Sequence, residues 1–181
     1  MKKTAFDKVS RHYDKFMHRM NFFRTDQIKD ILQLKGEEIV LDIGGGTGYF
    51  ANEIKDLCRK VIVLDESPKM IEEAGVYSDI ELITSNIFQH SLKHQSVDAV
   101  ILSDVFHHIE KQGELLDIVS DLLKPKGVLL IHDFDISYYK TKILRMFEFT
   151  LFGKLYFRTL EEVQSMVISH GFQIREIYNQ D

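Results

Sequence analysis

The sequence predicts a doubly wound α/β fold, in which a mostly parallel sheet carries helices on both of its faces. Short, nearly all-apolar runs alternate with amphipathic helical patterns from residue 38 onward, and a glycine-rich loop follows the first run. Strands that are apolar throughout are typical of a parallel sheet buried on both sides. With 181 residues and 44% hydrophobic side chains, and without repeats or linkers, the chain is expected to form a single domain.

Five strands are expected, each a short apolar run bounded by turn residues. They are 39–43, 61–64, 80–84, 97–102 and 128–131. After the first strand, residues 48–57 form a helical pattern with Phe50, Ile54 and Leu57 on one side. Right-handed crossovers then place the loops after all strands on one edge of the sheet, where ligands bind.

The second and third helices are marked by their own signals. Ser67 is a good N-cap, Pro68 suits the first helical position, and Gly75 ends that short helix. The third helix is indicated by apolar residues at helical spacing: Leu115, Leu116, Val119, Leu122 and Leu123. The sequence KPKG at 124–127 then predicts a turn before the fifth strand.

Two further segments flank this alternating region. Residues 4–34 are expected to form one or two helices before the first strand. After the fifth strand comes an aromatic-rich helical stretch, and then a helix with a capping box at Thr159 and Glu162 that ends at Gly171. Residues 172–178 are predicted to form a sixth strand. The single domain thus has three parts, 1–36, 37–134 and 135–181.

The composition excludes several classes of protein. The formal charge of −5 argues against the phosphate attraction on which most nucleic-acid binding depends. Cys58 is the only cysteine, so an internal disulfide or a cysteine-rich metal site cannot form. Asp7 and Lys8 interrupt what would be the apolar part of an export signal, and no apolar stretch reaches the ~20 residues of a spanning helix. A cytoplasmic location is therefore expected.

The loop in the sequence VLDIGGGTGYF is the main candidate for ligand binding. Gly44, Gly46 and Gly48 alternate, so the backbone can turn sharply and lie against a ligand. A tight structural turn would use the same residues, and GTGYFA also satisfies the dinucleotide pattern G-x-G-x-x-G/A. A Walker-type phosphate loop is excluded because no Lys-Ser/Thr pair follows the last glycine.

Two carboxylates narrow the choice of ligand. Asp42 precedes the loop, where a pyrophosphate would have to come close. At ~5 Å and an effective dielectric constant of ~20, the repulsion between the Asp42 carboxylate and one phosphate charge is ~3 kcal/mol, which corresponds to about a hundredfold in affinity. Asp65 ends the second strand, where a carboxylate can accept hydrogen bonds from a ribose diol. Asp42 thus favours a ligand that is cationic or neutral at that end, and Asp65 fits nicotinamide and adenosyl cofactors equally.

Three motifs in this order resemble the class I S-adenosylmethionine-dependent methyltransferases of the small-molecule type. LDIGGGTG matches their acidic-x-G-x-G-x-G motif, VLDESPKM is similar to their D-x-S-x-x-M segment, and LLKPKGVLLI is similar to their L-K-P-G-G run. The resemblance implies a Rossmann-like sheet of order 3-2-1-4-5 plus strand 6. It also implies an N-terminal lid (1–36), a cofactor-binding core (37–134) and an acceptor cap within 135–181.

The resemblance also implies which residues contact S-adenosylmethionine. The glycines would line its methionine part with Asp42 shaping the loop, and Asp65 would hold the ribose. The other implied contacts are Glu66, Met70, Asn86 and Ile87 around the adenine, Ser103 at the end of the fourth strand, and Tyr13 in the lid. Asn86 stands where the family usually has an acidic residue.

Candidate catalytic groups follow the fourth and fifth strands. His107 or His108 could act as a general base because histidine titrates near neutral pH, and Asp104 is a further candidate. Asp104 and Asp133 end adjacent strands. This arrangement of two carboxylates resembles that of the metal-dependent O-methyltransferases. No third ligand is apparent, and no metal is expected.

The segment 138–157 lies where the family places its acceptor cap, and its aromatic and basic residues suit a hydrophobic or anionic small-molecule acceptor. The same segment could pack in the core or form a homodimer. The family's antiparallel seventh strand is expected to be missing or supplied by a partner at the open sheet edge. The alternatives to an enzyme of this type are a non-catalytic S-adenosylmethionine-binding or regulatory subunit and a nicotinamide-dependent oxidoreductase.

Overall fold

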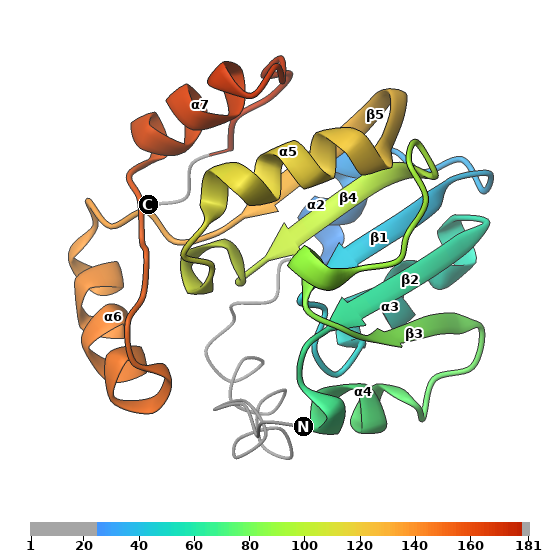
Figure 1. The fold of residues 1–181 in the computed structure, drawn as a ribbon, viewed down its shortest axis with the longest axis horizontal. Helices are drawn as coiled ribbons and strands as arrows, with labels where there is room; N and C mark the ends of the chain where they lie inside the picture. The colour runs from blue at the N-terminus through green and yellow to red at the C-terminus, as the bar shows by residue number, and fades with distance from the viewer. Residues whose placement is uncertain (1–24, 179–181) are drawn as a thin grey trace.

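The computed structural model describes residues 25–178, and its centre is a five-stranded sheet of order β3-β2-β1-β4-β5 (Figure 1). All four strand pairs are parallel. The strands are β1 (Ile39–Ile43), β2 (Lys60–Asp65), β3 (Ile80–Thr84), β4 (Val97–Ser103) and β5 (Leu123–His132). The order confirms the predicted one and reverses between β1 and β4, which puts the ends of these two strands at the ligand-binding switch point.

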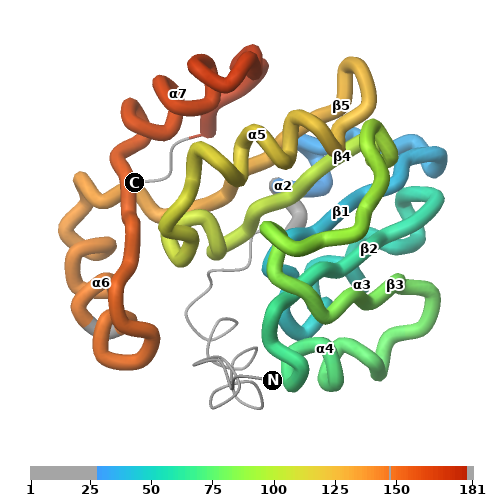
Figure 2. Tube along the Cα trace, viewed as in Figure 1, coloured from blue at the N-terminus to red at the C-terminus, as the bar shows by residue number. Residues whose placement is uncertain are grey.

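Helices cover both faces of the sheet, and each face has its own apolar core (Figure 2). On one face, α5 and α7 pack over side chains such as Leu41 and Val100. On the other face, α2 and α3 pack over Val40 and Val63. The helices are α2 (Thr25–Leu32), α3 (Tyr49–Ile54), α4 (Pro68–Ala74), α5 (Gln112–Leu122), α6 (Tyr139–Phe152) and α7 (Leu160–Ser169). Short 3-10 turns lie at Lys55–Leu57, Ile87–Gln89 and Phe106–His108.

The local capping signals are confirmed. The Ser67 hydroxyl accepts a hydrogen bond from the Met70 N–H at 3.3 Å. Thr159 and Glu162 form the reciprocal capping box at the start of α7. Such caps can be predicted from sequence because donor and acceptor lie within one helical turn of each other.

The predicted sixth strand is wrong. Residues 172–178 form no strand, and between residues 25 and 178 the strand β5 pairs only with β4. Ile174, Ile177 and Tyr178 are exposed, so the apolar residues of this segment do not enter a sheet. Within the described residues no seventh strand follows either, and the β5 edge is open. An alternating pattern indicates that a strand can form but does not supply the neighbour that it needs.

The predicted turn at 124–127 is also wrong, because these residues belong to β5. The pairing of β4 with β5 shifts register between Val97 and Ala99, and Lys126 has a φ of +69°. An irregularity of this kind takes up extra residues without ending the strand. The proline and glycine therefore mark a bulge within β5.

Of residues 1–36, expected to form a helical lid, the structure describes α2, which packs into the apolar core through Ile28 and Leu32. Tyr13 and the rest of 1–24 lie outside the described residues. Among the helices from residue 25 to 178, none is long and apolar enough to cross a membrane.

Candidate functional site

A pocket opens where the β1 loop meets the end of β4. Its empty space is about 400 Å³, including the part open to solvent. It is lined by Asp42, Gly44, Gly45, Gly46, Thr47, Tyr49, Phe50, Ser103 and Asp104. None of these lining residues is a Lys or Arg, so the described part of the chain offers no cation to a phosphate there.

The glycine loop adopts a backbone that other residues rarely take. Gly44, Gly46 and Gly48 have φ values of +71°, +56° and +71°. A Cβ atom on Gly44 would lie 2.3 Å from Val105 Cγ2, because the segment after β4 presses against the loop. The loop therefore needs glycine at Gly44 for two reasons, the positive φ and the close approach of Val105.

Gly44→Ala is expected to destabilise the fold by about 2–5 kcal/mol, the sum of left-handed backbone strain and overpacking. Gly171→Ala is the matched control. Gly171 also has a positive φ (+87°), but a Cβ there would have no neighbour within 4 Å. The control should cost only about 1–2 kcal/mol. Urea unfolding of both variants tests this, and equal losses would show that Val105 gives way.

Asp65 is held at the end of β2 by two backbone groups. The Gly46 N–H donates to its Oδ2 at 3.0 Å, and the Ser67 N–H donates to its Oδ1 at 2.7 Å. The carboxylate thus ties the glycine loop to the start of α4. Its neighbour Glu66 is exposed and accepts a hydrogen bond from Asn86 Nδ2 at 2.8 Å.

Three residues implied as adenine contacts also have structural roles. Asn86 Oδ1 accepts from the Phe88 N–H at 3.0 Å and so caps a 3-10 turn. Met70 is buried beneath the glycine loop near Gly46, and Ile87 is buried in the core. Asp65, Glu66 and Asn86 therefore lie together at the ends of β2 and β3.

Two pocket carboxyls are buried without full hydrogen bonding. Asp42 Oδ2 and Asp104 Oδ1 have no hydrogen-bond partner among the described residues. Burial, followed by the charge of Asp65, raises the pKa of Asp42 to about 7. Burial, followed by the charge of Asp133, raises the pKa of Asp104 well above 3.8. A cation entering this pocket would meet two carboxyl groups that each have one oxygen without a hydrogen-bond partner among the described residues.

A backbone hydrogen bond to the end of β5 fixes Asp104 after β4. Its φ is +52°, and its N–H donates to the His132 carbonyl at 2.9 Å. His132 Nδ1 lies 3.2 Å from Ser103 Oγ and 3.8 Å from Asp104 Oδ1. Ser103 and Asp104 thus occupy the pocket wall, with His132 behind them.

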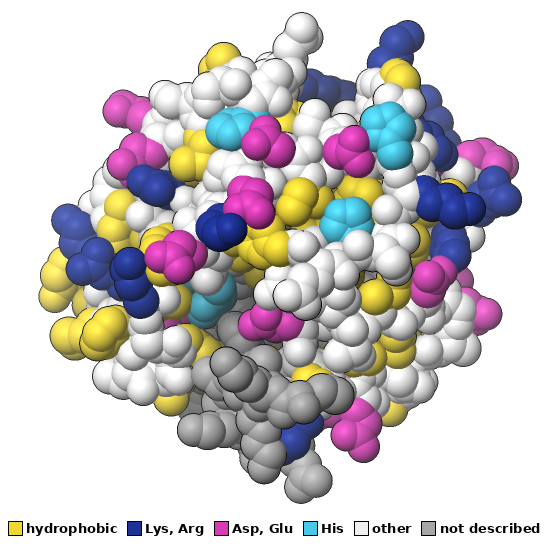
Figure 3. All heavy atoms as spheres, in the orientation of Figure 1, with side chains coloured by type: hydrophobic (Ala, Val, Ile, Leu, Met, Phe, Trp, Pro, Cys, Tyr) yellow, Lys and Arg dark blue, Asp and Glu magenta, His cyan; other side chains and the backbone are white. Residues whose placement is uncertain are grey.

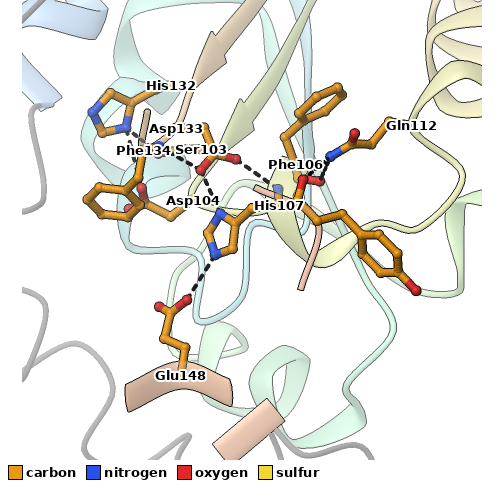
Figure 4. A network of polar contacts seen from close by, with 10 residues as sticks. Ser103, Asp104, Phe106, His107, Gln112, His132, Asp133, Phe134 and Glu148 are labelled. Carbon is orange, nitrogen blue, oxygen red and sulfur yellow. Dashed lines mark hydrogen bonds and ion pairs between the residues drawn. The ribbon is translucent and has the colours of Figure 1, made fainter. Parts of the chain in front are cut away.

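His107 lies beside this wall between two carboxylates (Figure 4). Its Nδ1 is 2.5 Å from Asp133 Oδ1, and its backbone N–H donates to Asp133 Oδ2 at 2.9 Å. On the other side, its Nε2 forms an ion pair at 3.2 Å with Glu148 Oε2 of α6, without the geometry of a hydrogen bond. Phe157 stacks on the ring with the centroids 4.3 Å apart.

The charges around His107 decide its protonation. Burial opposes the charged form, but Asp133 and Glu148 together outweigh it and raise the pKa of His107 to about 10. The neighbouring His108 shows the reverse: burial, and then the charge of His107, lower its pKa to about 3. At neutral pH the site therefore holds one charged and one neutral imidazole.

His107, His108 and Glu148 also offer ligand atoms that all lie within 4.8 Å of one another. Such a group could hold a metal ion in principle. In this structure the charged His107 itself provides the cation between Asp133 and Glu148. The ion pair therefore accounts for the arrangement.

Two residues of the site were missed in the sequence. Glu148 is the only acidic residue in α6, and this isolated charge among apolar and basic residues is the one local signal that could have drawn attention to it. Gln112 is buried, and its Nε2 donates to the Phe106 and Tyr156 carbonyls at 2.9 and 2.8 Å. It joins the His107 turn to the segment after α6, and nothing in its local sequence marks this role.

A family model for a methyltransferase domain matches residues 10–177 of the chain. An uncharacterised methyltransferase of Staphylococcus carnosus is 24% identical over 184 residues, covering 96% of this chain and 86% of that protein. The mitochondrial ubiquinone biosynthesis O-methyltransferase of Dictyostelium discoideum is 27% identical over 144 residues, covering 64% of this chain. The match spans only 45% of that protein.

The fold is shared with solved structures. A chain in the complex between the Haloferax volcanii Trm112 methyltransferase activator and a methyltransferase superposes with a TM-score of 0.86 at 18% identity. The match covers 97% of this chain and 80% of that chain. At this identity the likeness concerns the fold.

Proposed function

Because this chain belongs to the family of S-adenosylmethionine-dependent methyltransferase domains, we propose that it methylates a hydroxyl group of an apolar aromatic small molecule. Asp104 is the base in this proposal, and His107 is a charged positioning residue. The single observation that carries the proposal is the pair of buried, incompletely bonded carboxyls, Asp42 and Asp104, beside the glycine loop.

The pocket fits the chemistry of this cofactor. S-adenosylmethionine carries ammonium and sulfonium charges and no phosphate, and the pocket has carboxyls but no lining Lys or Arg. Asp42 and the loop glycines would hold the methionine part. Asp65, fixed by the Gly46 and Ser67 N–H groups, would accept hydrogen bonds from the ribose.

When bound, S-adenosylmethionine supplies a methyl carbon on a sulfonium that is already activated for in-line displacement. The protein must then align the acceptor and remove its proton, and orientation alone can supply about 7–11 kcal/mol. Asp104 is suited to proton removal because it lines the pocket and because burial raises its pKa well above 3.8, which makes its carboxylate a stronger base. His107 is too deeply buried to touch the acceptor, but its charge favours a developing oxyanion nearby.

The acceptor is proposed from the rings around His107 and His108 and from one relative. Phe134 and Phe157 lie against the His107 ring, with Phe152 against His108, so the side of the site next to α6 is aromatic. The Dictyostelium relative is named as a ubiquinone biosynthesis O-methyltransferase. An alkyl-substituted catechol is the corresponding test acceptor.

The test is transfer of labelled methyl from S-adenosylmethionine to an alkyl catechol, a primary amine and a carboxylic acid. Methylation of the catechol is expected, and Asp104→Asn should lower kcat by about 10²–10⁴-fold. Its Kd for S-adenosylmethionine should change less. The control is Asp117→Asn, at an exposed acid on α5. An unchanged kcat in Asp104→Asn would refute the base, and cofactor binding without any acceptor would favour a non-catalytic subunit.

A further inference from the structure

The helix α6 presents an exposed apolar face that no other described element covers. Tyr139, Ile143, Met146 and Phe149 are 77%, 48%, 70% and 61% exposed. At 3.6 residues per turn their positions fall on one side of the helix. We call these four side chains the outer face of α6. The opposite side packs inward through Thr141, which is buried, and through Glu148.

Cations accompany the outer face of α6, and no acidic residue of this helix lies beside it. Lys140, Lys142 and Arg145 are exposed. At helical spacing Lys140 and Arg145 lie on the two flanks of the face, and Lys142 lies within it. Glu148, the only acidic residue of α6, turns away from it to His107. In Figure 3, dark-blue and yellow side chains gather on the side of the molecule where Figure 1 places α6. This concentration of cations occurs in a chain whose formal charge is −5.

We propose that the outer face of α6 binds the surface of an anionic lipid membrane, with the four apolar side chains among the headgroups. A helix with apolar side chains on one face and Lys or Arg along its flanks is suited to this position. The long basic side chains can reach the lipid phosphates while their stems cover apolar surface. The proposal goes beyond methyl transfer and does not depend on the acceptor.

Charge complementarity favours a membrane over a second copy of the chain. A two-fold contact between copies would place the same patch on both sides and so bring Lys140, Lys142 and Arg145 close to the same three cations of the other copy. An anionic bilayer instead offers negative charge over the whole patch, worth about fivefold in binding for each nearby cation.

The test is flotation of the full chain with vesicles of phosphatidylcholine alone or with 30% phosphatidylglycerol, at low and at 0.5 M salt. Binding is expected only to the anionic vesicles and should weaken in high salt. The variant Lys140→Gln/Lys142→Gln should bind about 25-fold more weakly. Lys93→Gln/Lys126→Gln, which removes two exposed lysines elsewhere, should leave binding within about threefold.

The apolar part of the face is tested in the same assay with Met146→Glu. This variant should lose binding by more than tenfold, whereas Ile168→Glu, at an exposed apolar residue of α7, should not. Both positions are exposed, so the unfolding midpoint should not change. No binding to either vesicle, or equal binding to both, overturns the proposal. A dimer in light scattering that Met146→Glu disperses, without vesicle binding, also overturns it and assigns the face to a second copy.

Discussion

Asp42→Asn is expected to stabilise the ligand-free protein by about 2–4 kcal/mol at pH 8. Burial raises the pKa of Asp42 to about 7, whereas an unfolded Asp titrates near 3.8. The unfolded state therefore releases its proton first, and the native protein loses stability as pH rises from about 4 to about 7. Above pH 7 the full destabilisation by the buried charge of Asp42 is present, and below pH 4 this destabilisation vanishes. The amide removes the charge and with it this pH dependence.

The same variant is expected to weaken S-adenosylmethionine binding by about tenfold to a hundredfold, because the buried carboxylate no longer offsets the charge of the ligand. Stability and affinity thus change in opposite directions. Urea unfolding at pH 4 and 8 and calorimetric titration measure the two effects. Asp56→Asn, at an exposed acid outside the pocket, is the control. A variant that is both less stable at pH 8 and unchanged in affinity would contradict the assignment.

His107→Ala is expected to destabilise the protein by about 3–5 kcal/mol at pH 6, because Asp133 and Glu148 would lose the cation that lies between them. The substitution removes the contact with Glu148 that holds α6 beside the pocket. Thermal unfolding measures the total, and proteolysis within α6 reports its detachment. Unchanged stability together with a protected α6 would show that the ion pair is dispensable.

A surface pair provides the matched control. His94 Nδ1 lies 2.6 Å from Asp121 Oδ1, but both side chains are more than half exposed. His94→Ala should therefore cost about 0–1 kcal/mol. Both histidines lie within 2.6 Å of an aspartate oxygen, but only His107 is buried and has a second carboxylate, Glu148, beside it.

The His107 contribution also has a defined pH window. The pKa of His107 in the folded protein is raised to about 10, above its unfolded value near 6.5. Its stabilisation is therefore complete below pH 6.5 and is lost as pH rises toward 10. The stability difference between wild type and His107→Ala should shrink over that range. A constant difference would mean that His107 is neutral.

The features that could be predicted from the sequence are those whose signals lie close together in the chain. The structure confirms the Ser67 and Thr159 caps, the glycine loop and the five strands. Each of these features is encoded by residues only a few positions apart. The strand at 172–178 was wrong because pairing with β5 depends on a neighbour that no local pattern specifies.

The site shows the same division. Asp42 and Asp104 were found from their positions at strand ends, Ser103 was implied by the family resemblance, and the structure brings the three into one pocket. The contact between His107 and Glu148 joins residues 41 positions apart in sequence. The protonation of His107 follows from that contact, so the sequence alone suggested a base where the structure places a cation.

The proposed function requires that buried carboxyls beside the glycine loop recognise a cationic cofactor. Titration of the chain with S-adenosylmethionine at pH 6.5, in buffers of different ionisation enthalpy, tests it most directly. At this pH the amino group of the ligand is charged, and Asp42, with a pKa of about 7, is mostly protonated. Binding should release a substantial fraction of a proton, and Asp42→Asn should reduce that release. Tight binding without proton release in wild type would contradict the claim.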